Sequence, residues 1–599
     1  MRHLLAIVML MTSAAPVAAA PMAYPQTNRG FEVEKGPAGL SVPDPYRWLE
    51  ADVRTDANVA KWVEDQNKLT MAYLAGLPKR EQIRQRLTEL YNYERFGIPR
   101  VKGGVQFFTR NSGLQNQSVL YVQSPGAEPR VLIDPNPWAK DGATALAEWQ
   151  PSDDGKLLVY AVQDGGTDWR TLKVRNVATG QDLPDVIEWV KSSAIAWKKD
   201  GSGFYYSRFP EQAGPKYLGV SLNQKLYFHK LGTPQSADQL IYDTPAFPKR
   251  GHFGQVTDDG RWLVIITAEG TDDRYEVHIA DIARGETPRA LVTGLDFDWS
   301  LAGSKGETLY FRTNKDAPRG RIVAMNALTG AISEIVPEGA ATLTGASLVG
   351  NRLVAETLED AKSVVRLHEL DGKPVGTVPL PGIGTAGGFE SSADGVTYFA
   401  FSSFATPGSI WRYNAATNSA EVVRQAKVAF NPADYTVSQV FYPSKDGTKV
   451  PMFVAHHKDV DVSKPHPTLL YAYGGFNISS TPGFSVSRLV WMEMGGVFAL
   501  ANIRGGGEYG AAWHDAGRLL NKQNVFDDFI AAGEALVKNG TTTPQQLAIQ
   551  GGSNGGLLVG AVTNQRPDLF AAALPAVGVM DMLRPASCTH LTLPAADYV

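Results

Sequence analysis

The chain has 599 residues, 43% of them hydrophobic, with 57 Lys and Arg against 61 Asp and Glu. This length predicts about two to four domains, each able to bury a core. The formal charge of −4 provides no basic field for nucleic acid or an anionic membrane, and 20% charged residues with ordinary aromatic content excludes a disordered chain. The 59 glycines favour a turn-rich β protein over a helical one.

The first residues have the composition of a secretory signal peptide. Arg2 and His3 form a short basic start, residues 4–11 an apolar run, and residues 16–20 a small-residue cleavage region. The run is too short to span a bilayer, and the alternative is an N-terminal core helix. We therefore expect residues 1–20 to be a signal peptide and the mature protein to be secreted, into the periplasm.

Residues 21–90 are predicted to be a helical segment. Val59, Trp62, Val63, Leu69 and Tyr73 fall near helical spacing, and a second run follows at Ile83, Leu87 and Leu90. Two short helices need a larger partner to cover their apolar faces, and we expect them to pack on the C-terminal domain described below.

From residue 91 to residue 430 a single pattern recurs, a turn glycine followed at once by a β-rich apolar run. The marker glycines are Gly104, Gly155, Gly201, Gly260, Gly306, Gly350 and Gly395. Asp precedes four of them, as in an Asp-Gly turn between two strands of a hairpin. Seven copies spaced 44 to 59 residues apart predict a seven-bladed β-propeller, because a four-stranded blade needs neighbours to bury its faces. The alternative is a run of unrelated hairpins in a sandwich.

Residues 431–599 change to strand and helix alternation. A hairpin is predicted around residues 445–447, followed by strands at 468–473, 497–502 and 547–550 and a helix near 525–537. This alternation is typical of a mostly parallel sheet covered by helices.

The strongest local motif is Gly551-Gly552-Ser553-Asn554-Gly555, a G-x-S-x-G sequence between a predicted strand and a predicted helix. This is the context of a nucleophile elbow, in which the glycines permit a sharp turn and the serine hydroxyl projects above the sheet. Ser553 would be the nucleophile, and the Asn554 N–H would help hold the oxyanion of a tetrahedral intermediate. A phosphate-binding or merely structural turn is the alternative, but the Lys-Ser/Thr ending of a P-loop is missing.

Several segments together resemble the prolyl oligopeptidase family of serine peptidases. They are DPYRWLE at 44–50, NSGLQNQSVLYVQ at 111–123, FYPSKDGTKVPMF at 441–453, YGGFNIS at 473–479, ANIRGGGEYG at 501–510, NKQNVFDDF at 521–529, GGSNGGLLV at 551–559 and NQRPDLF at 564–570. The resemblance covers residues 25–584. It implies a multi-domain fold, a seven-bladed β-propeller plus an α/β-hydrolase domain.

By this resemblance Ser553 is the nucleophile, and the Tyr473 hydroxyl joins the Asn554 N–H in the oxyanion hole. Phe476 and Val579 are implied to line an apolar pocket for a proline ring. The implied activity is cleavage of short proline-containing peptides after proline, by a monomer without cofactor or metal. The lone Cys588 offers neither a disulfide nor a Cys-based metal site.

The catalytic triad is incomplete in this sequence. In α/β-hydrolases an Asp or Glu and then a His follow the serine, but of ten histidines only His590 follows Ser553, and it lies before the strands expected to carry the acid and base. The family segments that bear the catalytic Asp, the catalytic His and a substrate-binding Arg have no counterpart. We therefore expect a C-terminally truncated, inactive hydrolase domain, since loss of a triad member removes most of the rate.

The last residues depart from the family in an unusual way. Pro585 and Pro594 replace aromatics, whereas Asp597 and Tyr598 return in register, so that only Tyr598 could keep a pocket role. Two compensating frame shifts would produce this pattern, and resequencing codons 583 to 605 tests that hypothesis. Two other functions stay open, a non-catalytic propeller-based peptide-binding protein and an esterase.

Overall fold

The computed structural model of the chain describes residues 23–36, 39–165, 167–211 and 221–581. The predicted signal peptide and the segment after Asp581, with Cys588, His590 and Tyr598, lie outside these residues. The chain divides into two compact units, Met1–Arg84 and Gln85–Val599.

The first unit contains a small hairpin and the predicted helices. Strands β1 (Val33–Lys35) and β2 (Ser41–Pro43) pair antiparallel. The helices are α1 (Ala57–Ala75) and α2 (Arg80–Tyr91), which confirms the helical spacing; α2 begins in the first unit and ends in the second. Asp56 caps α1, because its carboxylate accepts hydrogen bonds from the N–H groups of Asn58 and Val59. The packing of residues 21–90 on the C-terminal domain stays a prediction.

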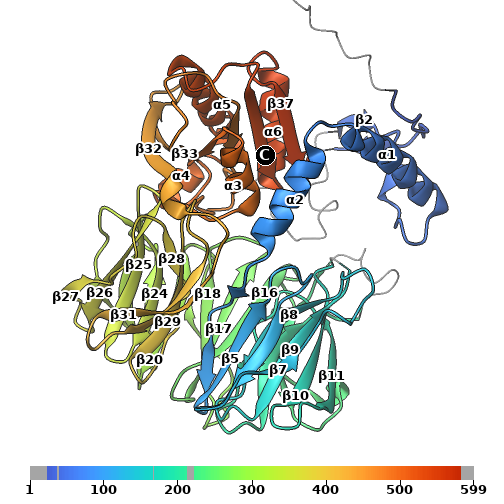
Figure 1. The fold of residues 1–599 in the computed structure, drawn as a ribbon. Coiled ribbons are helices and arrows are strands. Elements are labelled where there is room, and N and C mark those ends of the chain that lie inside the picture. The colour runs from blue at the N-terminus through green and yellow to red at the C-terminus, as the bar shows by residue number, and fades with distance from the viewer. Residues whose placement is uncertain (1–22, 37–38, 166, 212–220, 582–599) are drawn as a thin grey trace, which may run out of the picture. The chain divides into compact units, whose positions relative to one another are not determined.

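The second unit begins with seven sheets of consecutive antiparallel strands, which confirms the seven-bladed propeller (Figure 1). Blades 1 to 3 contain β3 (Arg95–Phe96), β4 (Arg100–Lys102), β5 (Val105–Asn111), β6 (Val119–Gln123) and β7 (Arg130–Ile133); β8 (Ala145–Pro151), β9 (Leu157–Gln163), β10 (Arg170–Asn176) and β11 (Asp182–Val190); and β12 (Ala196–Trp197), β13 (Gly203–Arg208), β14 (Lys225–Lys230) and β15 (Gln239–Tyr242).

The other four blades follow in chain order. They contain β16 (Arg250–Val256), β17 (Trp262–Glu269), β18 (Glu276–Asp281) and β19 (Arg289–Val292); β20 (Trp299–Lys305), β21 (Thr308–Thr313), β22 (Arg321–Asn326) and β23 (Ile332–Val336); β24 (Thr342–Val349), β25 (Arg352–Glu359), β26 (Lys362–Glu369) and β27 (Pro374–Thr377); and β28 (Thr385–Gly387), β29 (Val396–Ser402), β30 (Ser409–Asn414) and β31 (Ser419–Gln425).

The marker glycines turn the chain from the first to the second main strand of each blade. All seven have a positive φ, from 59° at Gly306 to 81° at Gly395, a conformation that favours glycine. Where Asp precedes the glycine, its carboxylate accepts the N–H two residues on, as Asp154 does from Lys156 at 3.1 Å. The repeat therefore marks one turn of each blade.

The ring closes without strand exchange, because β3 pairs with β5 of its own sheet. The first and last blades meet instead through side chains. The Arg424 guanidinium lies 5.6 Å from the Phe96 ring centroid and 5.4 Å from that of Phe108, and Arg100 donates to Glu390 at 3.3 Å. Cation–π contacts and one ion pair therefore join the two ends of the ring.

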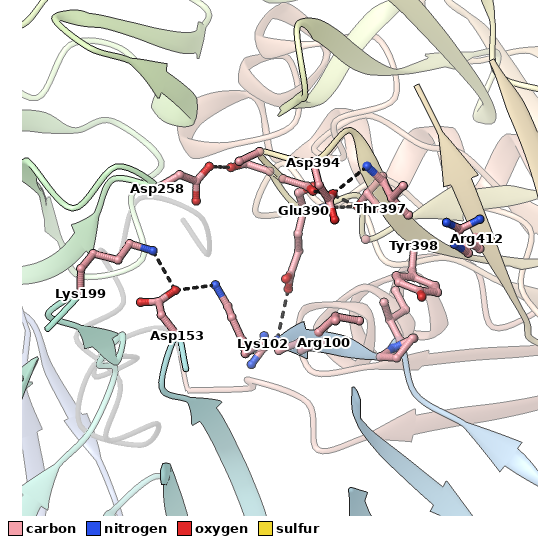
Figure 2. Close-up of a pocket in the computed structure, with 18 residues that line it drawn as sticks. Arg100, Lys102, Asp153, Lys199, Asp258, Glu390, Asp394, Thr397, Tyr398 and Arg412 are labelled. Carbon is pink, nitrogen blue, oxygen red and sulfur yellow. Dashed lines mark hydrogen bonds and ion pairs between the residues drawn. The ribbon is translucent and has the colours of Figure 1, made fainter. Parts of the chain in front are cut away.

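Turns between first and second strands surround a cavity of about 510 Å³, shown in Figure 2. Asp153 of blade 2 accepts from Lys102 of blade 1 at 3.0 Å and from Lys199 of blade 3 at 2.8 Å. Ser391 of blade 7 donates to Asp258 of blade 4. Hydrogen bonds between blades thus line this opening of the propeller, which we call the charged mouth.

The C-terminal domain is a six-stranded mixed sheet in the order β32-β33-β35-β34-β36-β37. Its elements are β32 (Tyr435–Pro443), β33 (Lys449–His457), β34 (Thr468–Tyr471), α3 (Val486–Glu493), β35 (Val497–Ala501), α4 (Ala511–Asp515), α5 (Gln523–Lys538), β36 (Leu547–Gly552), α6 (Asn554–Gln565) and β37 (Ala572–Ala576). Strands β34 to β37 run parallel to one another, and β32 and β33 form the predicted antiparallel hairpin.

Helices cover both faces of this sheet. Phe529 of α5 and Val559 of α6 are fully buried in one core with alternate strand residues such as Ile549. On the other face, Arg488 of α3 lies 4.4 Å from the Phe498 ring centroid. Helix α6 ends two residues before Pro567, because a residue before proline is driven out of the helical conformation.

Candidate active site

Three of the predicted site residues follow three neighbouring parallel strands. Tyr473 comes two residues after β34, Ser553 follows β36 directly, and Val579 comes three residues after β37. The sheet registers align these ends, since Tyr471 pairs with Gln550 in the β34–β36 ladder. The carboxyl ends of parallel strands are where open α/β sheets place ligands, and the structure brings all three residues to that edge.

Ser553 has the backbone of a nucleophile elbow. Its φ is 55° and its ψ −117°, an unusual conformation for a residue with a side chain, and it stands between the last residue of β36 and the first of α6. A side chain at Gly555 would come within 2.8 Å of the Ala472 carbonyl oxygen, and one at Gly551 would clash with the Gly555 backbone. The glycines of the motif are therefore required by close approach of the backbone.

The Asn554 side chain ties the elbow to the Tyr473 loop. Its Nδ2 donates to the Tyr473 carbonyl at 2.6 Å, and its Oδ1 accepts from Lys522 Nζ at 2.9 Å. Asn554 is also the first residue of α6, so its N–H belongs to the helix N-terminus, where amide groups favour negative charge. This position suits a backbone donor to an oxyanion next to Ser553.

Lys522 has no role in the sequence-based prediction of the site. It is buried, and its ammonium also lies 3.3 Å from the Gly474 carbonyl oxygen, so it bridges two site loops. Its position at the N-terminal cap of α5 could have pointed to it in the sequence. A cation there is disfavoured by the helix dipole and therefore needs a specific partner.

Phe476 stands in a loop with an uncommon backbone. Phe476 and Asn477 both have left-handed conformations, with φ of 55° and 54°. The Asn477 N–H lies 3.2 Å from the Gly505 carbonyl oxygen and 3.0 Å from His514 Nδ1. Phe476 is half-buried and Val579 is buried, and their pocket roles stay predictions.

The glycine-rich loop of residues 504–510 is anchored by charged side chains, of which Arg504 and Asp528 are buried. Arg504 donates to Asp528 of α5 at 2.6 Å and to Asp446 at 2.5 Å, which raises the pKa of Arg504 against the effect of burial. Glu508 is completely buried and accepts the Ser480 N–H at 2.7 Å. Burial raises the pKa of Glu508 to about 7.

No described histidine donates to or accepts from the Ser553 hydroxyl. The buried His514 directs Nδ1 toward Gly505 and Asn477, and His456 and His466 contact backbone carbonyls. Within residues 23–581, apart from the short gaps, no group of three or more His, Cys, Asp or Glu side chains could hold a metal ion. No helix in the described part of the chain has the length and apolarity to cross a membrane.

A seven-bladed propeller joined to an α/β-hydrolase sheet with a serine elbow defines a class of serine peptidase. The sequence model of the prolyl oligopeptidase N-terminal β-propeller domain matches residues 25–426, and that of the prolyl oligopeptidase family matches residues 482–598. The chain belongs to the prolyl oligopeptidase family of serine endopeptidases, which confirms the family and the fold predicted from the sequence.

Curated relatives are similar over nearly the whole chain. Prolyl endopeptidase of Elizabethkingia meningoseptica is 42% identical over 569 residues, which cover 94% of this chain and 79% of the relative. Prolyl oligopeptidase A of Amanita bisporigera is 33% identical over 620 residues, 94% of this chain and 80% of the relative.

Solved structures agree with the fold. One from a study of two prolyl endopeptidases has a TM-score of 0.88 and 40% identity, covering 94% of this chain and 83% of its own. Prolyl oligopeptidase B of Galerina marginata, bound to a 25-residue macrocyclization substrate, has a TM-score of 0.88 and 32% identity, covering 94% and 84%.

Proposed function

We propose that the protein cleaves short peptides on the carboxyl side of proline, with Ser553 attacking the proline carbonyl to form an acyl-enzyme. The observation that carries this proposal is the left-handed backbone of Ser553 between β36 and α6. That geometry is costly and is kept where a serine must face a carbonyl above a sheet. The names of the relatives support proline as the residue before the cleaved bond.

The tetrahedral intermediate would be held from two sides. The Asn554 N–H at the start of α6 would donate to the oxyanion, and the Tyr473 hydroxyl, from the neighbouring strand end, would be the second donor. Phe476 and Val579 would supply apolar walls for the proline ring, which carries no charge to pair. A pocket role of Tyr598 belongs to the same proposal.

The proton acceptor for Ser553 is not found among the described residues. Since no described histidine contacts Ser553, we propose that the polypeptide of residues 1–599 acylates slowly. Removing one triad member commonly leaves a residual of about 10³ to 10⁴ over water. The same observation favours the second candidate, a propeller-based protein that binds proline peptides without cleaving them.

Location and assembly are also proposals. The composition of residues 1–20 supports export to the periplasm, where the mature chain would act as a monomer on small peptides. Loops of the propeller lie against the loops that follow β34 and β35, as in the hydrogen bond from Asn477 to Asp273, which supports selection of short substrates.

The test uses a blocked Gly-Pro nitrophenyl ester and the matching amide. Residues 1–599 are expected to turn over both far more slowly than the Elizabethkingia meningoseptica enzyme, and Ser553→Ala to remove the remaining ester hydrolysis. Turnover within about tenfold of that enzyme, abolished by Ser553→Ala, would show that a base is present and would refute the slow acylation. Tight binding of the peptides with no cleavage at all would favour the second candidate.

A further inference from the structure

Four blades contact the hydrolase domain through the same kind of loop. In blades 4 to 7 the connection between the second and third strands carries a residue that touches this domain. The contacts are Asp273 with Asn477, the Pro318 carbonyl with the Ala511 N–H, Asp360 with the Tyr509 hydroxyl, and Phe404 with Phe453 and Phe498. These loops therefore lie at the opposite end of each second strand from the charged mouth.

One of these contacts reaches the loop that follows Tyr473. Asn477 Nδ2 donates to Asp273 Oδ2 at 2.7 Å, and Asn477 directly follows Phe476, the predicted pocket wall. Two consecutive non-glycine residues in left-handed conformation are unfavourable unless the surroundings hold them. The hydrogen bonds of the Asn477 N–H and of its side chain stabilise this left-handed conformation.

The opposite side of Asn477 is closed by the glycine-rich loop of residues 504–510. A side chain at Gly507 would come within 2.7 Å of Asn477 Oδ1 and would also meet its carbonyl oxygen. Asn477 thus lies between the hydrolase loop and the propeller, and its amide group is oriented with Nδ2 toward the propeller.

Asp273 itself is presented by a fixed turn. Its neighbour Asp272 pairs with Arg274. Burial alone would raise the pKa of Asp272, but the hydrogen bonds and charge of Arg274 outweigh burial and lower this pKa, and the charge of Arg518 lowers it further. Arg518 follows α4 of the hydrolase domain, so charge complementarity across the contact supports the position of the turn.

We propose that Asp273 is a positioning residue for the peptidase site, which holds Asn477 and through it Phe476, so that the proline pocket is complete only while the propeller is docked. This rests on the proposed function. In addition to limiting substrate size, the propeller then contributes to the choice of proline through one hydrogen bond.

The test measures binding, because it does not depend on turnover. The dissociation constants of benzyloxycarbonyl-Gly-Pro and benzyloxycarbonyl-Gly-Ala are determined by calorimetry with residues 1–599 and with Asp273→Ala, Asp273→Asn, Asn477→Gly and the double variant Asp273→Ala/Asn477→Gly. Asn477→Gly removes the side chain but suits the left-handed backbone. Asp371→Ala is the matched control, since Asp371 is an exposed turn aspartate that pairs with Lys373.

Asp273→Ala is expected to weaken binding of the proline ligand about tenfold, the effect of losing one hydrogen bond to a charged group, and to reduce the preference over the alanine ligand. Asp273→Asn should restore most of the affinity for the proline ligand, because a carboxamide oxygen can accept a hydrogen bond from Asn477. The double variant should bind no more weakly than either single variant. Amide hydrogen exchange in residues 474–480 should accelerate in Asp273→Ala and stay unchanged in Asp371→Ala.

Binding within twofold of wild type in Asp273→Ala, with unchanged exchange, would overturn the proposal. Loss of affinity that Asp273→Asn does not restore would also overturn it, since the hydrogen bond would then not be the cause. If the wild-type chain itself prefers neither ligand, the proposed proline pocket is wrong, and the exchange rates at 474–480 still decide whether Asp273 positions the loop.

Discussion

Replacing His229 tests a buried ion triad that joins blades 2 and 3. His229 Nδ1 lies 2.7 Å from Asp238 and Nε2 lies 2.9 Å from Asp185, and all three side chains have at most 1% exposure. An imidazole with one N–H can serve only one carboxylate, whereas the imidazolium serves both. Burial opposes the charge, but the two carboxylates outweigh it and raise the pKa of His229.

His229→Phe would leave two buried carboxylates without their cation. Breaking a buried ion pair in this way costs about 3–5 kcal/mol, because the remaining charges stay desolvated. The propeller has about 340 residues, and at an unfolding entropy of about 2.1 cal/mol/K per residue each kcal/mol moves the midpoint of its thermal unfolding by about 1.4 °C, so we expect Tm to fall by roughly 4–7 °C. Scanning calorimetry at pH 6 measures this shift.

The same triad makes stability depend on pH. The folded pKa of His229 lies above the unfolded one, so its contribution is complete below pH 6.5 and is lost as pH rises through the folded value. His252→Gln is the control, since burial lowers the pKa of His252 to about 4 and its contribution changes only below pH 6.5. A Tm change under 2 °C in His229→Phe would refute the reasoning. The same pH dependence of Tm in wild type and in His229→Phe would also refute it.

Two further changes test the supports of the site. Glu508→Gln should reduce the fall in stability between about pH 4.5 and 7, because burial raises the pKa of Glu508 to about 7 and the folded chain keeps a proton there that the unfolded chain releases. Urea unfolding at pH 5 and 8 measures the difference in unfolding free energy, and an equal difference in wild type and Glu508→Gln would contradict this prediction. Lys522→Met removes the ammonium that joins Asn554 to Gly474, and it should lower the unfolding free energy by about 1–3 kcal/mol and accelerate amide exchange at residues 473–475. Lys464→Met, on an exposed turn, is the control. Equal effects of the two substitutions would contradict this prediction.

Local features of the sequence predicted the architecture well. The marker glycines and the Ser553 motif could be found because a turn with positive φ restricts the residue that stands in it, whatever the rest of the chain does. The contacts that support the site could not be predicted from the sequence. Asn477 and Asp273 are 204 positions apart, His229 and Asp185 44 apart, and Asn554 and Lys522 32 apart, and only the folded chain brings them together.

The charged mouth changes how the propeller ring carries mechanical load. Without strand exchange, the seam between blades 1 and 7 has no strand ladder among the described residues, and side-chain contacts such as those of Arg424 and Arg100 resist its separation. The hydrogen bond from Ser391 to Asp258, however, runs from blade 7 to blade 4 and not to a neighbour. A force that pulls the seam apart is therefore shared with the far side of the ring, because outward movement of the last blade also breaks this bond across the opening.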